Sequence, residues 1–452
     1  MTAAPRTSFD ALIVGAGLAG STAAIQLARA GWSVALIERQ HFPRRKVCGE
    51  CLAASNLPLL QALGVGDAFH ARAGRALRRV TLLHGDSAVT ADLPAADHDH
   101  DHDHDHNHDH DHDRGPWGRA LGRETLDGLL LDQARAAGAA VFQPWSVQAI
   151  LGTVGAWYVE LRALESAALL RLRATLVIDA HGCWEDLPTD RPNRRLARSA
   201  ADLFAFKANF TGSQLPEGAI SVLALHGGYG GMVVADAGAT TVACCIRRDR
   251  LSALRSAAPG LRAGDAVQDW LERECAGVQR ALQGALRDGP WLSSGPLHPG
   301  VHLEAGDDIF RIGNAAGEAH PILGEGMSMA LQSAALLTSV LLGPLGDAAV
   351  PDAAAQAGLQ RRYAAAWRNA FAPRLRLAAV FAHVAMRPRG AQALMKLLGI
   401  WPGLLTRGAR WGGKVRCLQP NGRPGTQADP KDRPGAGLAL QAARCTPREE
   451  ST

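Results

Sequence analysis

The feature that most constrains the fold is the stretch DALIVGAGLAGSTAAIQLARAG near the N-terminus. Its apolar residues Ala11–Val14 predict a strand, and Gly15, Gly17 and Gly20 follow in G-x-G-x-x-G spacing before an Ala-rich helix. The first glycine permits a tight turn from strand to helix, the second lets the backbone approach a phosphate, and the third lets the helix pack closely on the strand. This unit predicts a helix N-terminus that binds a pyrophosphate.

A second strand, predicted over Ser33–Ile37, follows the helix and ends at Glu38. A carboxylate at this position accepts hydrogen bonds from a ribose diol and disfavours a 2′-phosphate. The complete strand–helix–strand unit therefore predicts a dinucleotide of the FAD or NAD type rather than NADP. By itself it does not separate FAD from NAD.

Three further stretches favour FAD. They are FPRRKVCGECL (Phe42–Leu52), VIDAHG (Val177–Gly182) and DIFRIGNAAGEAHPILGEGMSMALQSA (Asp308–Ala334). The last predicts a strand, a Gly-Asn turn, a loop containing proline, and a second helix that opens at GEGM. Free N–H groups at that helix N-terminus would stabilise the negative charge of a reduced isoalloxazine ring, whereas NAD has no such requirement.

The four motifs, in this order, resemble the glutathione-reductase-type flavoprotein superfamily, in the branch that holds aromatic hydroxylases, geranylgeranyl reductases and flavin-dependent halogenases. The PRRKVCGE element is most similar to the geranylgeranyl-reductase-like oxidoreductases, and the resemblance spans about residues 8–345. It implies a set of FAD-binding residues: Gly15, Gly17, Gly20 and Glu38 for the ADP half, Arg45 or Lys46 over the middle of the cofactor, Arg123 at the ribose and phosphates, Gly313 and Asn314 along the ribityl–pyrophosphate stretch, and Gly324, Gly326 and Met327 beside the flavin ring.

One position departs from the family pattern. The family usually has Gly-Asp where this chain has Gly313-Asn314. Asparagine still hydrogen-bonds a ribityl hydroxyl but brings no charge. Weaker or altered FAD binding is therefore expected at this position.

The fold class expected from the motifs is α/β, with a discontinuous Rossmann-like FAD-binding domain, an antiparallel β-sheet substrate domain and C-terminal helices. Strand-like runs separated by glycine turns, over Ala219–Arg248, favour the antiparallel sheet, and Ala76–Ala96 predicts a β-hairpin. The expected boundaries are 8–75, 115–190 and 298–345 for the FAD domain, 76–114 and 191–297 for the substrate domain, 346–415 for the helices, and 416–452 for a disordered tail rich in Pro and Gly.

Residues 97–113, DHDHDHDHDHNHDHDHD, form a low-complexity tract within the expected connection between the two domains. Alternating imidazoles and carboxylates can bind Zn²⁺ or Ni²⁺. A catalytic metal site, however, needs a few ligands in a fixed geometry with an oriented surrounding shell, and a degenerate repeat prefers no ligand over the others. We interpret the tract as a solvated insert and predict no metal site; a His-rich metal-binding protein is the competing hypothesis.

The composition of the chain bears on its binding partners and on its cellular compartment. The basic residues are scattered, which argues against nucleic-acid binding. The N-terminus is a poor signal peptide, and the chain has no run of about 18 apolar residues. Eight irregularly spaced cysteines indicate reduced thiols and a cytoplasmic protein. The apolar run Leu394–Leu405 predicts a core or lid helix, with peripheral membrane contact as the alternative.

Four side chains near the expected flavin have two readings each. Cys48 and Cys51 form a C-x-x-C that could be a redox pair or simply part of the cofactor-contact element. His320 could donate a proton to substrate or flavin, or could bond the backbone of its loop. Tyr229 would face the pocket by family analogy, with packing as its default role. We assign no catalytic residue from the sequence.

The reaction expected from the resemblance is that of an FAD-dependent oxidoreductase that takes electrons from NAD(P)H. No second Gly-rich nucleotide motif appears between Gly138 and Pro299, so NAD(P)H would bind transiently. The leading hypothesis is a monooxygenase that hydroxylates an aromatic or polyketide-like small molecule. A geranylgeranyl-reductase-like C=C reductase of a prenyl or lipid chain is the alternative. A halogenase is disfavoured because the Trp-x-Trp-x-Ile-Pro element of tryptophan halogenases is missing.

Overall fold

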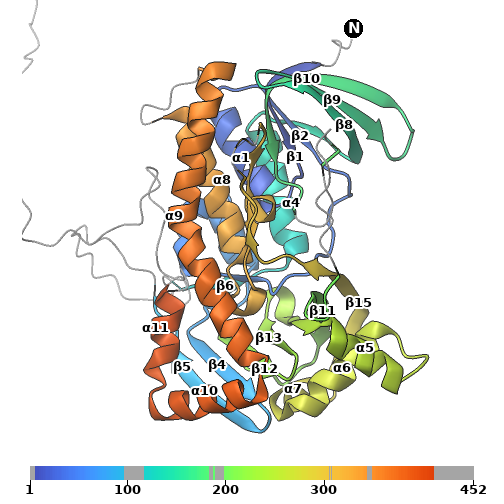
Figure 1. The fold of residues 1–452 in the computed structure, drawn as a ribbon, viewed down its shortest axis with the longest axis vertical. Helices are drawn as coiled ribbons and strands as arrows, with labels where there is room; N and C mark the ends of the chain where they lie inside the picture. Colours follow the sequence, from blue (N-terminus) through green and yellow to red (C-terminus); the bar gives the residue numbers. More distant parts are fainter. Residues whose placement is uncertain are drawn as a thin grey trace, which may run out of the picture.

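The computed structural model describes residues 6–95, 117–182, 187–188, 198–304, 306, 308–343 and 349–411. The His/Asp tract and the predicted disordered tail lie outside these residues. Figure 1 shows two sheets, one above the other, with a long helix running beside both. This mixed α/β architecture with C-terminal helices confirms the predicted fold class.

The upper sheet is built on the predicted strand–helix–strand unit (Figure 1). Its central strand pairs in parallel with a neighbour on each side, so that Ile13 lies between Leu36 and Ile178. The strand order is β7-β2-β1-β10-β9-β8, and β17 also pairs with β10. The strands are β1 (Ser8–Val14), β2 (Val34–Ile37), β7 (Ala140–Phe142), β8 (Trp145–Thr153), β9 (Ala156–Ala163), β10 (Leu169–Asp179) and β17 (Phe310–Arg311).

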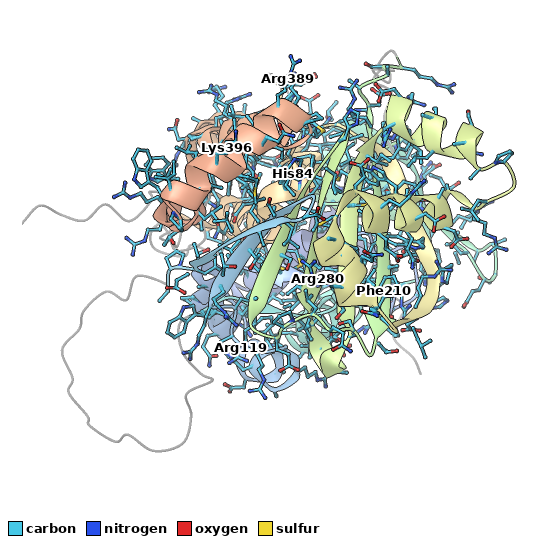
Figure 2. The ribbon with its side chains drawn as sticks, turned by 90° about the horizontal axis from the view of Figure 1, so that it is seen from below. His84, Arg119, Phe210, Arg280, Arg389 and Lys396 are labelled. Atoms are coloured by element: carbon cyan, nitrogen blue, oxygen red, sulfur yellow. The ribbon has the colours of Figure 1, made fainter. Side chains whose placement is uncertain are left out.

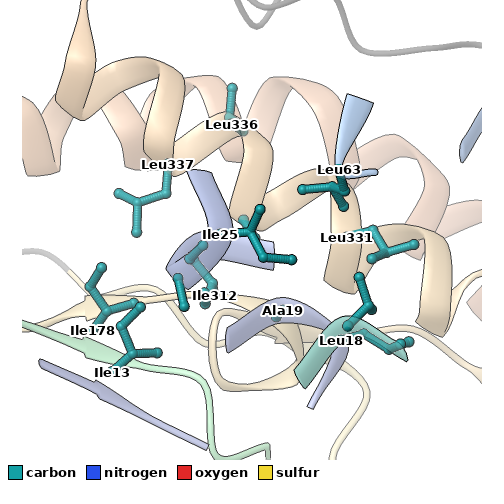
Figure 3. Packing of buried hydrophobic residues seen from close by; sticks show 14 of the residues in the cluster. Ile13, Leu18, Ala19, Ile25, Leu63, Ile178, Ile312, Leu331, Leu336 and Leu337 are labelled. Carbon is teal, nitrogen blue, oxygen red and sulfur yellow. The ribbon is translucent and has the colours of Figure 1, made fainter. Parts of the chain in front are cut away.

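The parallel pairs β2-β1-β10 form the buried part of this sheet, as expected for parallel strands, whereas β9 pairs antiparallel with β10 and with β8. On one face lie α1 (Leu18–Arg29), α4 (Arg123–Ala136) and α8 (Gly326–Leu342). Figure 3 shows Ile25 of α1 and Leu337 of α8 packed in one cluster with Ile13 and Ile178 of the sheet. On the other face, Leu12 and Val177 pack against Trp157 in a separate cluster. The short helices α2 (Leu57–Ala62) and α3 (Gly66–Arg72) adjoin the first cluster.

The lower sheet has the order β15-β11-β14-β13-β12-β4-β5. Its strands are β4 (Arg79–His84), β5 (Ser87–Asp92), β11 (Leu203–Thr211), β12 (Ala219–Leu225), β13 (Gly228–Val234), β14 (Thr240–Arg247) and β15 (Leu286–Leu297). The predicted hairpin over 76–96 is confirmed as β4–β5. The sheet is antiparallel as predicted except at one pair, because β4 runs parallel to β12. No pattern in the sequence predicts this parallel pair, because it joins segments more than a hundred residues apart.

Helices cover the two faces of the lower sheet differently. One face carries α5 (Arg248–Ala257), α6 (Ala263–Glu274) and α7 (Ala276–Leu282), with Trp270 buried against Phe206 and Cys244. These three helices were not predicted within the substrate region. The opposite face packs Leu82 and Tyr229 against C-terminal helices. Figure 2 shows this division from below, with α5–α7 on one side of the sheet and the helix carrying Arg389 and Lys396 on the other.

The C-terminal helices are α9 (Ala353–Ala385), α10 (Pro388–Ile400) and α11 (Gly403–Trp411). The first half of α9 packs into the upper core through Trp367 and Phe371, and its end packs against the lower sheet through Ala382. This helix therefore spans both sheets (Figure 1). Of the helices in the described part of the chain, none is long and apolar enough to cross a membrane.

Candidate functional site

A cavity of about 830 Å³ lies between the two sheets. Its lining comes from the glycine turn before α1, the loop before β3 (Cys51–Leu52), the N-terminus of α8, the lower sheet and the three C-terminal helices. Segments from the beginning, middle and end of the chain thus share one cavity. Most of the residues predicted to bind a cofactor lie at its upper end: Gly17, Lys46, Arg123, Gly313, Asn314, Gly324, Gly326 and Met327.

The glycine turn leaves open the space that a pyrophosphate would need. Gly15 has φ +101°, and a Cβ at Gly20 would lie 1.8 Å from the carbonyl oxygen of Gly15, so the protein itself requires these two glycines. A Cβ at Gly17 would meet nothing closer than Nη2 of Arg123, at 3.6 Å. Since Gly17 also lines the cavity, the missing side chain there leaves a cradle toward the cavity, which fits the predicted role.

Glu38 is fixed beside this turn. Its Oε2 accepts a hydrogen bond of 3.0 Å from the backbone N–H of Ala16, and its Oε1 accepts one of 2.8 Å from Gln40. The Arg44 guanidinium lies 3.7 Å away. Each carboxylate oxygen has a second lone pair, so the group can still accept hydrogen bonds from a ribose diol.

Positive charge surrounds the cradle. Arg123, in the first turn of α4, binds the carboxylate of Asp127 with two hydrogen bonds of 2.8 Å. Lys46 is half-buried in the cavity lining. Its burial, together with the charges of Arg123 and Arg44, lowers the pKa of Lys46 to about 8. A lysine whose pKa is lowered by burial and by neighbouring arginines fits an anionic ligand, because a pyrophosphate would favour its charged form.

Arg45 and Lys46 separate although they are neighbours in the sequence. Arg45 donates to the carboxylate of Glu124 at 3.1 Å and to the backbone oxygen and carboxylate of Asp288 at 2.6 Å. It thereby ties this loop to β15 and is not among the cavity-lining residues. Lys46 is the one of the two that the structure brings to the cavity.

The turn at Gly313 packs against the start of the helix that follows the first glycine motif. The N–H of Gly313 donates to Oγ of Ser333 at 2.8 Å, and a Cβ at Gly313 would lie 3.1 Å from Cβ of Ala19. The turn at Gly313–Ala315 therefore packs against the first turn of α1. Gly324 adopts φ +65°, which turns the chain into the start of α8 at Gly326. The free N–H groups of that helix terminus can face an anionic ring edge.

A buried ion pair that the sequence did not reveal joins the cofactor side to the lower sheet. Glu50, with φ +59°, pairs with Lys207 of β11, and both side chains are at most 1% exposed. The same carboxylate accepts from the hydroxyl of Thr241 and, at 3.0 Å, from the N–H of Arg123. Glu50 is the last residue of the PRRKVCGE element, but nothing in the sequence indicates that Lys207 is buried.

On the substrate side, Tyr229 lies in the cavity lining, as the resemblance implied, and its hydroxyl lies 3.1 Å from Nδ1 of His320. Burial, with a smaller effect of nearby His383, lowers the pKa of His320 to about 4, so the ring is neutral at pH 7.

Cys48 and Cys51 line the cavity and form no disulfide. In the described ranges no cluster of His, Cys, Asp or Glu could hold a metal ion.

Comparison with known proteins agrees with this geometry. Residues 8–226, just under half of the chain, match the family model of an FAD binding domain. A menaquinone reductase from Mycolicibacterium smegmatis is 44% identical over 61 residues, which cover 14% of this chain and 15% of that protein. The chain thus matches only a small part of the length of this curated relative.

Several solved structures share most of the fold. A myxobacterial chondrochloren halogenase is 19% identical, with TM-score 0.65 and coverage of 90% and 91%. A geranylgeranyl bacteriochlorophyll reductase-like protein from Thermoplasma acidophilum is 17% identical, with TM-score 0.66 and coverage of 88% and 92%. A probable FAD-dependent monooxygenase from Pseudomonas aeruginosa is 17% identical, with TM-score 0.56 and coverage of 90% and 99%.

The glycine cradle, the fixed carboxylate, the surrounding cations and the matched domain define a flavoprotein of the Rossmann type. Its cofactor is FAD. The matched residues thus confirm the FAD-binding domain that the sequence predicted.

Proposed function

We propose that the protein is an NAD(P)H-dependent monooxygenase that hydroxylates a hydrophobic or aromatic small molecule bound in the cavity. The observation that carries the proposal is the continuity of this cavity from the FAD cradle at Gly17 to the lower sheet at Tyr229. One ligand can occupy the upper end while another lies against the sheet. The flavin, when bound, supplies the redox chemistry, and the protein supplies orientation and exclusion of water.

The sheet end of the cavity suits an uncharged substrate. The described residues that line it from the lower sheet carry no charge: Val80, Leu82, Ala205, Phe206, Ile220, Ser221, Val222, Tyr229, Gly230, Gly231, Met232, Ala243, Cys244, Cys245 and Leu297. Burial raises the pKa of the Cys245 thiol to about 12 and that of the Tyr229 phenol well above its ordinary value, so both groups stay neutral. A charged group placed against these sheet residues would lose its hydration without gaining a charged partner among them.

The residues of the cradle have separate tasks in this proposal. Gly17 and the N-terminus of α1 would hold the pyrophosphate, Glu38 the ribose, and Lys46 with Arg123 the negative charge. Gly324, Gly326 and Met327 would lie beside the ring. The Tyr229 hydroxyl and neutral His320, paired at 3.1 Å, can hold a proton between the sheet and the proline loop.

A second reaction, reduction of a C=C bond in a prenyl or lipid chain, is favoured by the extent of the cavity. Its lining continues past the sheet to leucines of α10 and α11, including Leu394, Leu398 and Leu405. An extended apolar chain fits such a lining better than a single aromatic ring does. The likeness to reductases, and the similarity of PRRKVCGE to geranylgeranyl-reductase-like proteins, support the same reaction.

One experiment tests the proposal and separates the two reactions. The purified yellow protein is mixed with NADH or NADPH and isotopically labelled dioxygen, with panels of aromatic and prenyl compounds, and products are identified by mass spectrometry. Incorporation of one labelled oxygen supports hydroxylation, whereas gain of two hydrogens with no oxygen supports reduction. A flavin that neither nicotinamide reduces, with or without these compounds, would contradict NAD(P)H as the electron donor.

A further inference from the structure

The C-terminal helices carry many cations and no acids, and the redox chemistry does not require this excess of positive charge. Between Ala353 and Trp411 the chain contains nine arginines and one lysine and neither aspartate nor glutamate. The part from Arg387 to Trp411, comprising α10 and α11, holds five of these cations. The adjoining hairpin β4–β5 contributes the acids Asp86 and Asp92, so the cations of α10 and α11 still outnumber the acids beside them.

The same helices expose large apolar side chains. Five of the eleven that the described chain exposes lie between Val380 and Trp411, among them Ile400 at 70%, Trp401 at 62% and Trp411 at 69%. On α10, Met395 and Leu398 are buried toward the sheet, while Lys396, Leu397 and Ile400 face outward. Basic and apolar groups thus share the outer surface, a pattern that is typical of helices that lie in a membrane interface.

The outer surface is continuous with the cavity. Leu397 and Trp411 line the cavity and are also 41% and 69% exposed, so the cavity reaches the protein surface at these residues. Arg407 and Arg410 also belong to the lining. The open end therefore has a hydrophobic and cationic rim. Figure 2 shows Arg389 and Lys396 on α10, on the side of the molecule away from α5–α7.

We infer that this surface, formed by α10 and α11, docks peripherally on an anionic lipid bilayer and places the open end of the cavity against the lipid. The exposed tryptophans and leucine would enter the headgroup region, and the arginines and Lys396 would pair with lipid phosphates. A second copy of the chain or an acidic protein could also cover apolar residues. The absence of acids from Ala353 to Trp411 disfavours a second copy, because two like surfaces of this charge repel each other.

Docking goes beyond the proposed function and is measured without turnover. The full-length, FAD-loaded protein is sedimented with vesicles of phosphatidylcholine alone or mixed with phosphatidylglycerol. We expect binding to the mixed vesicles that is stronger by about tenfold or more, since each basic residue near an anionic surface contributes roughly fivefold, and release as salt is raised. Equal or absent binding to both kinds of vesicle would overturn the inference.

Paired variants localise the surface. Ile400→Ser with Trp401→Ser removes exposed apolar groups, and Arg389→Glu with Lys396→Glu reverses two charges; each pair should abolish most binding while leaving the flavin spectrum unchanged. Leu169→Ser, at a residue 78% exposed in the upper sheet, and Arg255→Glu on α5 are the matched controls and should bind as the unaltered protein does. If the control variants lose binding equally, the binding is not localised to α10 and α11 and the inference fails. If Ile400→Ser with Trp401→Ser instead dissociates an oligomer in solution, the surface binds a second copy of the chain and the inference fails as well.

Discussion

Replacing Gly17 by valine should remove FAD while leaving the protein folded. At Gly17 the backbone is extended, with φ −72° and ψ −170°, which valine adopts readily. A Cβ there has its nearest described neighbour at 3.6 Å, an ordinary van der Waals distance. Gly17 is the N-cap of α1, so the loss of a tolerated cap costs at most about 1 kcal/mol of unfolding free energy.

The effect on cofactor affinity should be much larger. The valine methyls would project into the cradle beneath Arg123, where backbone must approach the pyrophosphate. Overlap of this kind costs about 3 kcal/mol, which corresponds to about a hundredfold in Kd. Gly20→Ala is the matched comparison, because its Cβ would lie 1.8 Å from the oxygen of Gly15 and must push backbone apart. That variant should lose stability as well as flavin.

Two measurements check the reasoning: thermal unfolding of each apoprotein, and titration of each apoprotein with FAD followed by flavin fluorescence. Gly17→Val should unfold close to the unaltered apoprotein and bind FAD weakly, whereas Gly20→Ala should unfold at a clearly lower temperature. A folded Gly17→Val protein that is as yellow as the unaltered one would refute the assignment of the glycine turn to the pyrophosphate.

Three further predictions rest on other parts of the molecule. Glu38→Ala should weaken FAD binding by about 1–3 kcal/mol, the usual loss for a charged hydrogen-bond acceptor, and an unchanged affinity in apoprotein titration would count against the ribose contact. Glu50→Ala should lower the unfolding free energy by about 3–5 kcal/mol in chemical denaturation, because it leaves the Lys207 charge buried and unpaired; the double variant with Lys207→Met should recover most of that loss, and no recovery would argue against the pair. Deletion of residues 97–113 should leave flavin content and NAD(P)H oxidation intact, change stability by less than about 1 kcal/mol, and greatly reduce zinc binding in calorimetry; a folded deletion variant without flavin would show that the tract reaches the active site.

The local units of this protein could be predicted from the amino-acid sequence. The strand–turn–helix at Gly15–Gly20 is dictated by steric limits that act within a few residues, and the structure shows those limits directly in the short approach between Gly20 and Gly15. The hairpin over 76–96 and the helix that begins at Gly326 follow in the same way from turn residues and apolar periodicity. Cofactor class could be predicted because FAD binds largely to such local units.

The way in which these units combine depends on long-range contacts, which the sequence does not reveal. Pairing of Glu50 with Lys207 spans 157 positions, and the insertion of β4 beside β12 joins two regions in parallel; neither leaves a periodic signal in the chain. The separation of two neighbouring cations also leaves no signal in the chain: Lys46 lines the cavity, whereas Arg45 binds Asp288. Backbone turns follow from steric limits between residues that are close in the sequence. Ion pairs and strand pairings such as these depend instead on distant side chains, which must neutralise one another's charge and pack together in the protein interior.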